Sequence, residues 1–184
     1  MTPAALRAAL GRVPGDAPMT LGPGDLQTVL ALDHAIFHRR ADRVDRRRLE
    51  ACMGHASAQF TVARVHGAHD VLPIGYTGWF TLADGDRDAL LAGRLDRHAV
   101  RPGDGEAVYL FAWGMLRAWR GHGRAAELLR ALGEATRDHG PRLALLVSPA
   151  GARVAARFGL GPTGVRYGDE ALWATRTVTA PPTA

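Results

Sequence analysis

The stretch Met115-Leu-Arg-Ala-Trp-Arg120-Gly-His-Gly123-Arg-Ala-Ala126 decides the fold of this chain. The apolar run from Ala107 to Met115 precedes it and predicts a strand. A helix is predicted to follow, because apolar residues recur at helical spacing, at Ala125, Leu128, Leu129, Leu132 and Ala135. The order strand, glycine-rich turn, helix aims several unpaired backbone N–H groups at the positive end of a helix dipole. This arrangement is typical of a phosphate or diphosphate site.

The residues of the turn suit such an anion. Gly121 and Gly123 carry no Cβ, so a ligand can approach the backbone closely. Arg120 adds a fixed positive charge beside them. A glycine turn that merely links two elements is the alternative interpretation.

The pattern Arg120-x-x-Gly123-x-Ala125 resembles the [Arg/Gln]-x-x-Gly-x-[Gly/Ala] signature of the GCN5-related N-acetyltransferases, the GNAT superfamily. In that family the turn binds the diphosphate of coenzyme A. The resemblance implies that the pantetheine arm lies between the strand ending at Leu116 and the strand starting near Leu143. The donor-binding residues that it implies are Met115, Leu116, Arg117, Arg120, Gly121, His122, Gly123, Arg124 and Ala125.

Helical and alternating patterns along the chain predict one mixed α/β fold of the α+β kind. The expected helices span residues 25–37, 43–53, 84–95, 124–139 and 152–158, after a short one in 1–11. The expected strands span residues 19–21, 58–66, 72–82, 106–116, 143–147, 165–167 and 172–178. This order predicts a mostly antiparallel central sheet with helices on both faces, as in the GNAT superfamily.

The resemblance covers about residues 18–178. We therefore expect an N-terminal extension at 1–17, an acyl-CoA N-acyltransferase domain at 18–178 and a disordered tail at 179–184. A chain of 184 residues can bury a sizeable core as one domain.

Composition narrows the class of protein further. The single cysteine, Cys52, excludes an internal disulfide and a cysteine-based zinc cage, so no metal is expected. No apolar stretch approaches the ~20 residues of a membrane span, and the N-terminus lacks the apolar region of a secretory signal. A cytoplasmic protein is the resulting expectation.

All 23 basic residues are arginine, and the net charge is +5. The excess of positive charge predicts an anionic partner, such as coenzyme A or an acidic acyl carrier protein. A biased codon composition or the avoidance of self-acylation would each explain the missing lysines. Nucleic acid is a further alternative, although no helix-turn-helix, zinc-finger or RNP signature is present.

Acyl transfer to an amine also needs proton transfer, and the usual groups are missing. The family often places a carboxylate on the central strand, but Tyr109–Trp113 has none. It often has a tyrosine acid where this chain has Ala155. His38 is the candidate base, because an imidazole with a reference pKa of about 6.5 can take a proton at neutral pH. Tyr167 is the candidate acid for the leaving thiol.

Other residues compete for these roles. His34 and His122 are alternative bases, although His122 lies in the turn and is expected to contact the ligand. Tyr76 and Tyr109 are alternative acids. The tryptophans Trp79 and Trp113 are expected in the core or in the wall of an acyl pocket.

The segments Pro73–Leu82, Gly103-Asp104 and Tyr109–Trp113 also resemble the toxin-activating lysine acyltransferases, which have the GNAT fold. Those enzymes take fatty acyl groups from acyl carrier protein. Phe37-His38-Arg39 stands where they carry their catalytic histidine, but Ala112 stands where they carry an aspartate. This resemblance implies a carrier-protein donor, acyl-ACP, and a long acyl chain.

The leading hypothesis is therefore an N-acyltransferase. It would move an acyl group from acyl-CoA or acetyl-CoA, with acyl-ACP as an alternative donor, to an amine of a peptide, a protein lysine or a small molecule. A catalytically inactive acyl-CoA-binding module of the same fold is the second hypothesis, and a nucleic-acid binder is the third. A homodimer stays an open alternative for the assembly.

Overall fold

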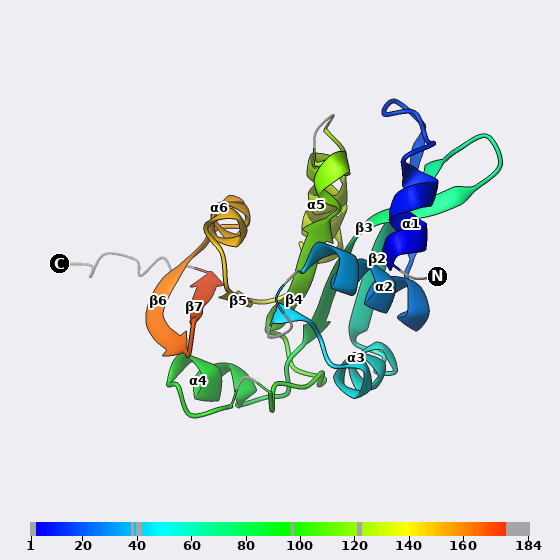
Figure 1. The fold of residues 1–184 in the computed structure, drawn as a ribbon. Coiled ribbons are helices and arrows are strands. Elements are labelled where there is room, and N and C mark those ends of the chain that lie inside the picture. Colours follow the sequence, from blue (N-terminus) through cyan, green and yellow to red (C-terminus); the bar gives the residue numbers. More distant parts are fainter. Residues whose placement is uncertain (1–2, 38, 40–41, 97, 121–122, 176–184) are drawn as a thin grey trace.

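The computed structural model describes residues 3–37, 39, 42–96, 98–120 and 123–175. A seven-stranded sheet forms its centre, in the order β1-β2-β3-β4-β5-β7-β6 (Figure 1). Neighbouring strands are antiparallel except β4 and β5, which are parallel. The expected mixed, mostly antiparallel sheet is thus confirmed. The strands are β1 Met19–Pro23, β2 Ala58–His66, β3 Val71–Thr81, β4 Val108–Met115, β5 Arg142–Leu146, β6 Leu160–Tyr167 and β7 Glu170–Thr175.

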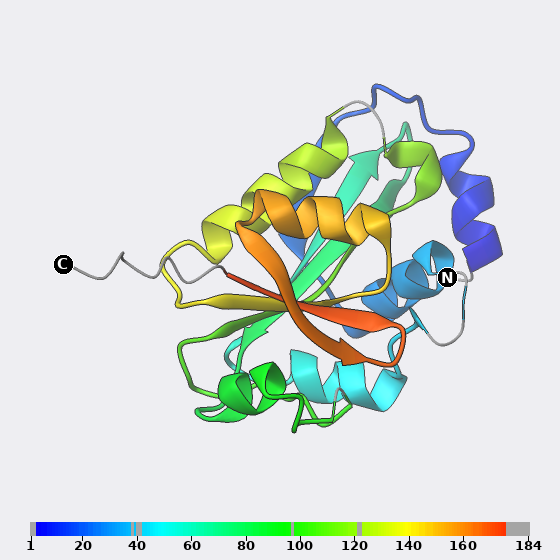
Figure 2. The same cartoon turned by 90° about the vertical axis from the view of Figure 1, so that its left-hand side faces the viewer.

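Helices cover both faces of the sheet (Figure 2). Helices α2 and α5 both pack against β3, which is buried along almost its whole length. In the part of the chain that the structure describes, no helix is both long and apolar enough to cross a membrane. The helices are α1 Pro3–Leu10, α2 Leu26–Ile36, α3 Arg46–Met53, α4 Asp86–Leu91, α5 Arg124–Ala135, α6 Pro149–Arg157 and the 3-10 helix η2 Arg117–Trp119.

Side-chain caps set where two helices begin, and they shift both starts from the expected positions. Helix α3 begins later than expected because the Asp45 carboxylate accepts a hydrogen bond from the Arg47 N–H at 2.9 Å. Helix α6 begins earlier because the Ser148 hydroxyl accepts one from the Gly151 N–H at 3.1 Å. Pro149, with its fixed φ, fits the first helical position.

Helix α1 belongs to the core that the sheet and helices share. Leu6 is fully buried and Leu10 is 7% exposed, and both lie in the main apolar cluster. The helix packs against α2 and β3. The described part of the expected N-terminal extension therefore lies directly against the rest of the domain.

Candidate functional site

The parallel strands β4 and β5 part soon after they meet. Their ladder consists of two residue pairs, Val108 with Arg142 and Tyr109 with Leu143. Both strands continue beyond this point without pairing with each other. The sheet is therefore split in its centre, between its two halves.

A bulge lies at the point of separation. On its other edge β4 pairs with β3, where Gly78 is opposite Ala112 and Trp79 is opposite Leu110. Phe111 is the extra residue between these pairs. Because a bulge bends its strand and increases the local twist, we attribute the divergence of β4 from β5 to this residue.

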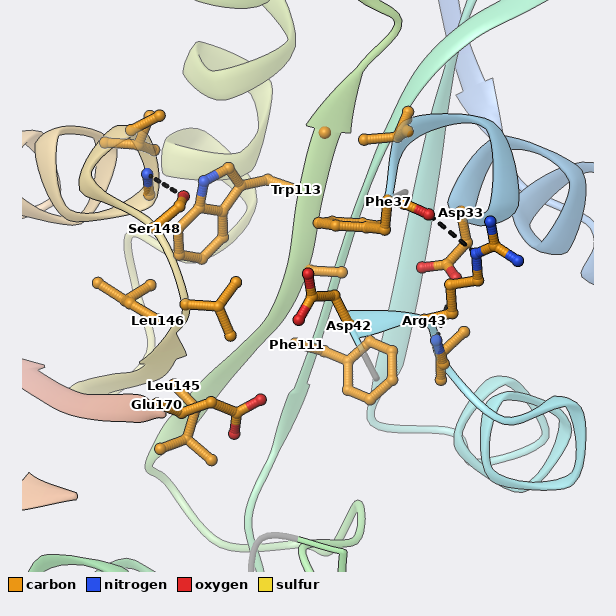
Figure 3. A pocket seen from close by; sticks show the side chains of 18 of the residues that line it. Asp33, Phe37, Asp42, Arg43, Phe111, Trp113, Leu145, Leu146, Ser148 and Glu170 are labelled. Carbon is orange, nitrogen blue, oxygen red and sulfur yellow. Dashed lines mark hydrogen bonds between the residues drawn. The ribbon is translucent and has the colours of Figure 1, made fainter. Parts of the chain in front are cut away.

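A cleft of about 840 Å³ occupies the space between the parted strands (Figure 3). One wall is apolar, and it is built by α5, β5 and the start of α6. The other wall combines charged and aromatic side chains from β4, the end of α2, the segment before α3 and α3 itself. The apolar wall includes Trp113 from β4, Ala125, Leu128, Leu129, Leu145, Leu146 and Val154, and the opposite wall includes Phe37, Asp42, Arg43, Arg48 and Phe111.

The first turn of α5 lies at one end of this cleft. Gly123 caps the helix with a φ of 75°, a conformation that favours glycine, and no atom lies within 4 Å of the Cβ that another residue would add. The first backbone N–H groups of a helix have no carbonyl partner within it. The N–H groups of Gly123, Arg124 and Ala125 therefore have no partner within the helix, and they lie next to the cleft. Gly121 and His122 lie outside the described residues.

Three of the expected donor-binding residues line the cleft: Met115, Arg120 and Ala125. The Arg120 Nε donates a hydrogen bond to the Met115 carbonyl at 2.9 Å. Arg120 thus holds the end of β4 against the turn, and it also borders the cleft.

Leu116 and Arg117, by contrast, do not line the cleft. Leu116 is 6% exposed, and its N–H already donates to the Ile74 carbonyl at 2.8 Å. Arg117 is exposed at the start of η2, and neither residue is among those that line the cleft. The Leu116 N–H is therefore not available to a pantetheine arm.

The side chain of Arg124 points away from the cleft. Its Nη2 donates to the carbonyls of Gly15 at 2.6 Å and Ala17 at 2.8 Å. The guanidinium carbon lies 4.7 Å from the centre of the Trp119 ring. Only the backbone N–H of Arg124 can meet a ligand at the turn.

The structure describes the expected acid, Tyr167, but not the expected base, His38. His38 lies outside the described residues, and His34 is exposed and does not line the cleft. The hydroxyl of Tyr167 donates to the Leu90 carbonyl at 2.8 Å, and burial raises its pKa. Tyr167 is not among the residues that line the cleft, so its role as the acid stays a prediction.

The alternative acids are buried tyrosines. Tyr76 is fully buried and donates its hydroxyl to Asp33 at 2.7 Å. Burial, together with the Asp33 carboxylate, raises the pKa of Tyr76 well above its usual value. Tyr109 borders the cleft at 4% exposure, and burial raises its pKa as well. Both hydroxyls are poor proton donors at neutral pH, although a thiolate needs only a weak acid.

Two carboxylates that the sequence analysis did not consider reach into the cleft. Asp42 enters from the segment before α3, and Glu170 enters from β7 on the opposite side (Figure 3). Asp42 and Glu170 are far apart along the chain. No local sequence pattern announces either, because only the fold brings them together.

A third carboxylate, Asp33, also borders the cleft, from helix α2, and was missed as well. It is 2% exposed, and it accepts hydrogen bonds from the Tyr76 hydroxyl at 2.7 Å and the Val44 N–H at 3.0 Å. Burial raises its pKa. Asp33 thus ties the segment that carries Asp42 to helix α2.

No protein-family model matches this sequence, and a search of curated proteins finds no significant match. Solved structures do share its fold. NAA60 from Arabidopsis thaliana, in complex with a bisubstrate analogue, is 15% identical at a TM-score of 0.61, over 86% of this chain and 98% of that chain. The loading GNATL domain of CurA from Lyngbya majuscula is 14% identical at a TM-score of 0.62, over 85% and 96% of the two chains.

The ribosomal-protein-S18-alanine N-acetyltransferase from Escherichia coli is a further neighbour. It is 9% identical at a TM-score of 0.57, over 91% of this chain and 99% of that chain. Likeness at these identities concerns the fold. The split sheet, the bulge on β4 and the glycine turn before α5 agree with it, and this chain has the fold of the GCN5-related N-acetyltransferases.

Proposed function

We propose that this protein is an N-acyltransferase that moves an acyl group from a coenzyme A thioester to an amine. The observation that carries this proposal is the cleft between the parted strands β4 and β5, with the start of α5 at one end. An extended thioester arm fits between the strands. Its diphosphate fits the unpaired N–H groups of the first turn of α5.

Acyl transfer requires the neutral amine, not the ammonium ion, as the nucleophile. The amine nitrogen attacks the thioester carbonyl, the new C–N bond forms, and the C–S bond breaks as the thiolate leaves. A base takes the proton that the amine loses, and the thiolate takes a proton to become the thiol. We propose Asp42 as the base, because its carboxylate enters the cleft on the same side as Phe111, the bulge residue.

Neighbours of the same fold support the choice of donor. NAA60 has also been solved with acetyl-CoA, and Naa50 from Arabidopsis thaliana with the bisubstrate analogue CoA-Ac-MVNAL. These complexes support acetyl-CoA as donor and a peptide amine as one class of acceptor for this chain. A protein lysine and a small amine are the other acceptors to include in a test.

Substitution in the apolar wall tests the donor cleft. Ala125 lines the cleft, whereas the adjacent Ala126 is exposed on the same helix and does not line it. We expect Ala125→Trp to abolish the release of free thiol from acetyl-CoA in the presence of an amine panel, because the indole fills the space of the arm.

Ala126→Trp is the matched control and should keep wild-type turnover. Equal thiol release by Ala125→Trp and Ala126→Trp would show that the donor does not bind in this cleft. Absence of any thiol release or CoA binding by the wild-type protein would remove the proposal.

The base can be identified by comparing three variants. Asp42→Asn should lower kcat about a hundredfold or more, the effect of losing a general base, with little change in the KM for acetyl-CoA. Glu170→Gln should act mainly on the KM of the acceptor. A large kcat loss in His38→Ala instead would return the base to the histidine predicted from sequence.

An acyl carrier protein is the second donor to test. Arg39, Arg46 and Arg47 are exposed close to the wall that carries Asp42, and an acidic carrier would complement them. Replacing all three by serine should weaken transfer from acyl-ACP and spare transfer from acyl-CoA. A non-catalytic thioester-binding module would instead bind both donors without turnover across the amine panel.

A further inference from the structure

A buried guanidinium lies directly behind the proposed anion site. Arg124 is the first residue of α5, and 7% of it is exposed. Trp119 covers one face of the guanidinium, and two backbone carbonyls accept from its Nη2. Its Nη1 is buried and has no hydrogen-bond partner among the described residues.

This charge has no balancing carboxylate in the described part of the chain, where the recorded ion pairs involve other arginines. It also lies at the positive end of the α5 dipole, so the two positive potentials add. Burying a charge without an opposite charge is costly. An anion bound at the first turn of α5 would offset part of this cost.

The same side chain fixes the turn in place. The N-terminal segment, residues 12–17, passes over the start of α5 (Figure 2), and Arg124 bonds to Gly15 and Ala17 within it. Helix α1 anchors this segment through Leu6 in the core. The first turn of α5 is thus held both by its own helix and by a segment more than a hundred residues away in the chain.

We propose that the side chain of Arg124 positions the diphosphate of the donor: the guanidinium braces the α5 turn against the N-terminal segment and adds positive potential behind the anion, without itself touching the anion. This inference rests on the proposed function. Its distinctive consequence is that Arg124 affects only donors that carry the diphosphate.

Two donors separate this role from a purely structural one. Acetyl-CoA carries the diphosphate, and acetyl-pantetheine carries the same thioester arm without it. Arg124→Leu should raise the KM for acetyl-CoA roughly five- to thirtyfold, the range for a charge at a partly buried helix end, with kcat little changed. Its kcat/KM for acetyl-pantetheine should equal that of the wild type.

Arg130→Leu is the matched control. Arg130 lies on the same helix, is exposed and pairs with Glu134 at 2.6 Å, so the variant removes the same charge from the surface. The kcat and KM of this variant should equal those of the wild type with both donors. Arg124→Lys keeps the positive charge but loses the planar guanidinium. We expect it to recover part of the affinity for acetyl-CoA that Arg124→Leu loses.

The outcomes are distinct. If Arg124→Leu does not fold, Arg124→Lys carries the test, with an intermediate loss confined to acetyl-CoA as the supporting result. Equal losses with both donors, or no loss with either, overturn the positioning role while the proposed function stands. A wild-type protein that binds neither coenzyme A nor acetyl-CoA overturns both.

Discussion

At the scale of single residues, Asp33 shows how burial sets the behaviour of a carboxyl group. Its two oxygens accept from different elements, the Tyr76 hydroxyl on β3 and the Val44 N–H before α3. Desolvation nevertheless outweighs these bonds and raises the pKa above its ordinary value of 3.8. The folded protein therefore holds the Asp33 proton more tightly than the unfolded chain does.

The sign of the resulting pH dependence follows from linkage. The contribution of Asp33 to stability is fully present below the pKa of the unfolded chain and is lost as the pH rises through the raised pKa of the folded state. Asp33→Asn cannot ionise, and its amide can still accept from Val44 and donate to the Tyr76 oxygen. We expect the variant to gain stability relative to the wild type between pH 4 and pH 7, as measured by urea unfolding.

Tyr76→Phe provides the comparison for this experiment. It removes the donor that stabilises the ionised carboxylate, and so it should steepen the loss of stability of the protein with rising pH. Parallel stability curves for all three proteins would show that Asp33 does not titrate differently in the folded state.

At the scale of elements, the pair β3 and β4 forms the continuous part of the sheet beside the split. Gly75 on β3 lies where a Cβ would be 2.8 Å from the Gly114 carbonyl oxygen and 3.2 Å from the Met115 Cα. Both neighbours are backbone atoms and cannot rotate away. The close approach of the two strands therefore depends on this glycine.

Gly75→Ala should destabilise the protein by about 1–3 kcal/mol, the usual cost of forcing extra volume into a packed interior. Chemical unfolding at neutral pH measures this. Gly15→Ala serves as the control, because no atom lies within 4 Å of its added Cβ. A midpoint for Gly75→Ala equal to that of the control would mean that the strands can separate there without cost.

Sequence patterns located most elements because helical spacing and alternation are properties of neighbouring residues. Their ends were harder, since one side chain can decide them: the Ser148 hydroxyl starts α6 before its apolar pattern begins. The glycine turn was recognisable because its chemistry is local. Asp42 and Glu170 were missed because they meet only after β4, β5 and β7 have assembled.

At the scale of the whole molecule, helix α1 is part of the folded unit. Leu6 packs into the same apolar cluster as Met115 and Trp119, which lie just before the glycine turn at the start of α5. The sequence favoured a boundary near residue 18 because family resemblance begins there. We propose instead that the folding unit includes α1.

Leu6→Ala should cost about 2–5 kcal/mol of unfolding free energy, as expected for a fully buried leucine. Val71→Ala is the surface control, because Val71 is 54% exposed. Thermal and urea unfolding of both variants measure the difference. If Leu6→Ala unfolds like the control, α1 is dispensable and the boundary near residue 18 holds.

The parting of β4 from β5 also leaves peptide groups in the middle of a sheet that face no neighbouring strand. An arm that carries its own amides, as pantetheine does, can act there as a substitute strand and complete the interrupted ladder. Deuterium exchange should then slow at residues 112–115 and 145–147 when coenzyme A binds, while β1 and β2 are unaffected. Under the proposed function, the donor itself would then complete the interrupted sheet.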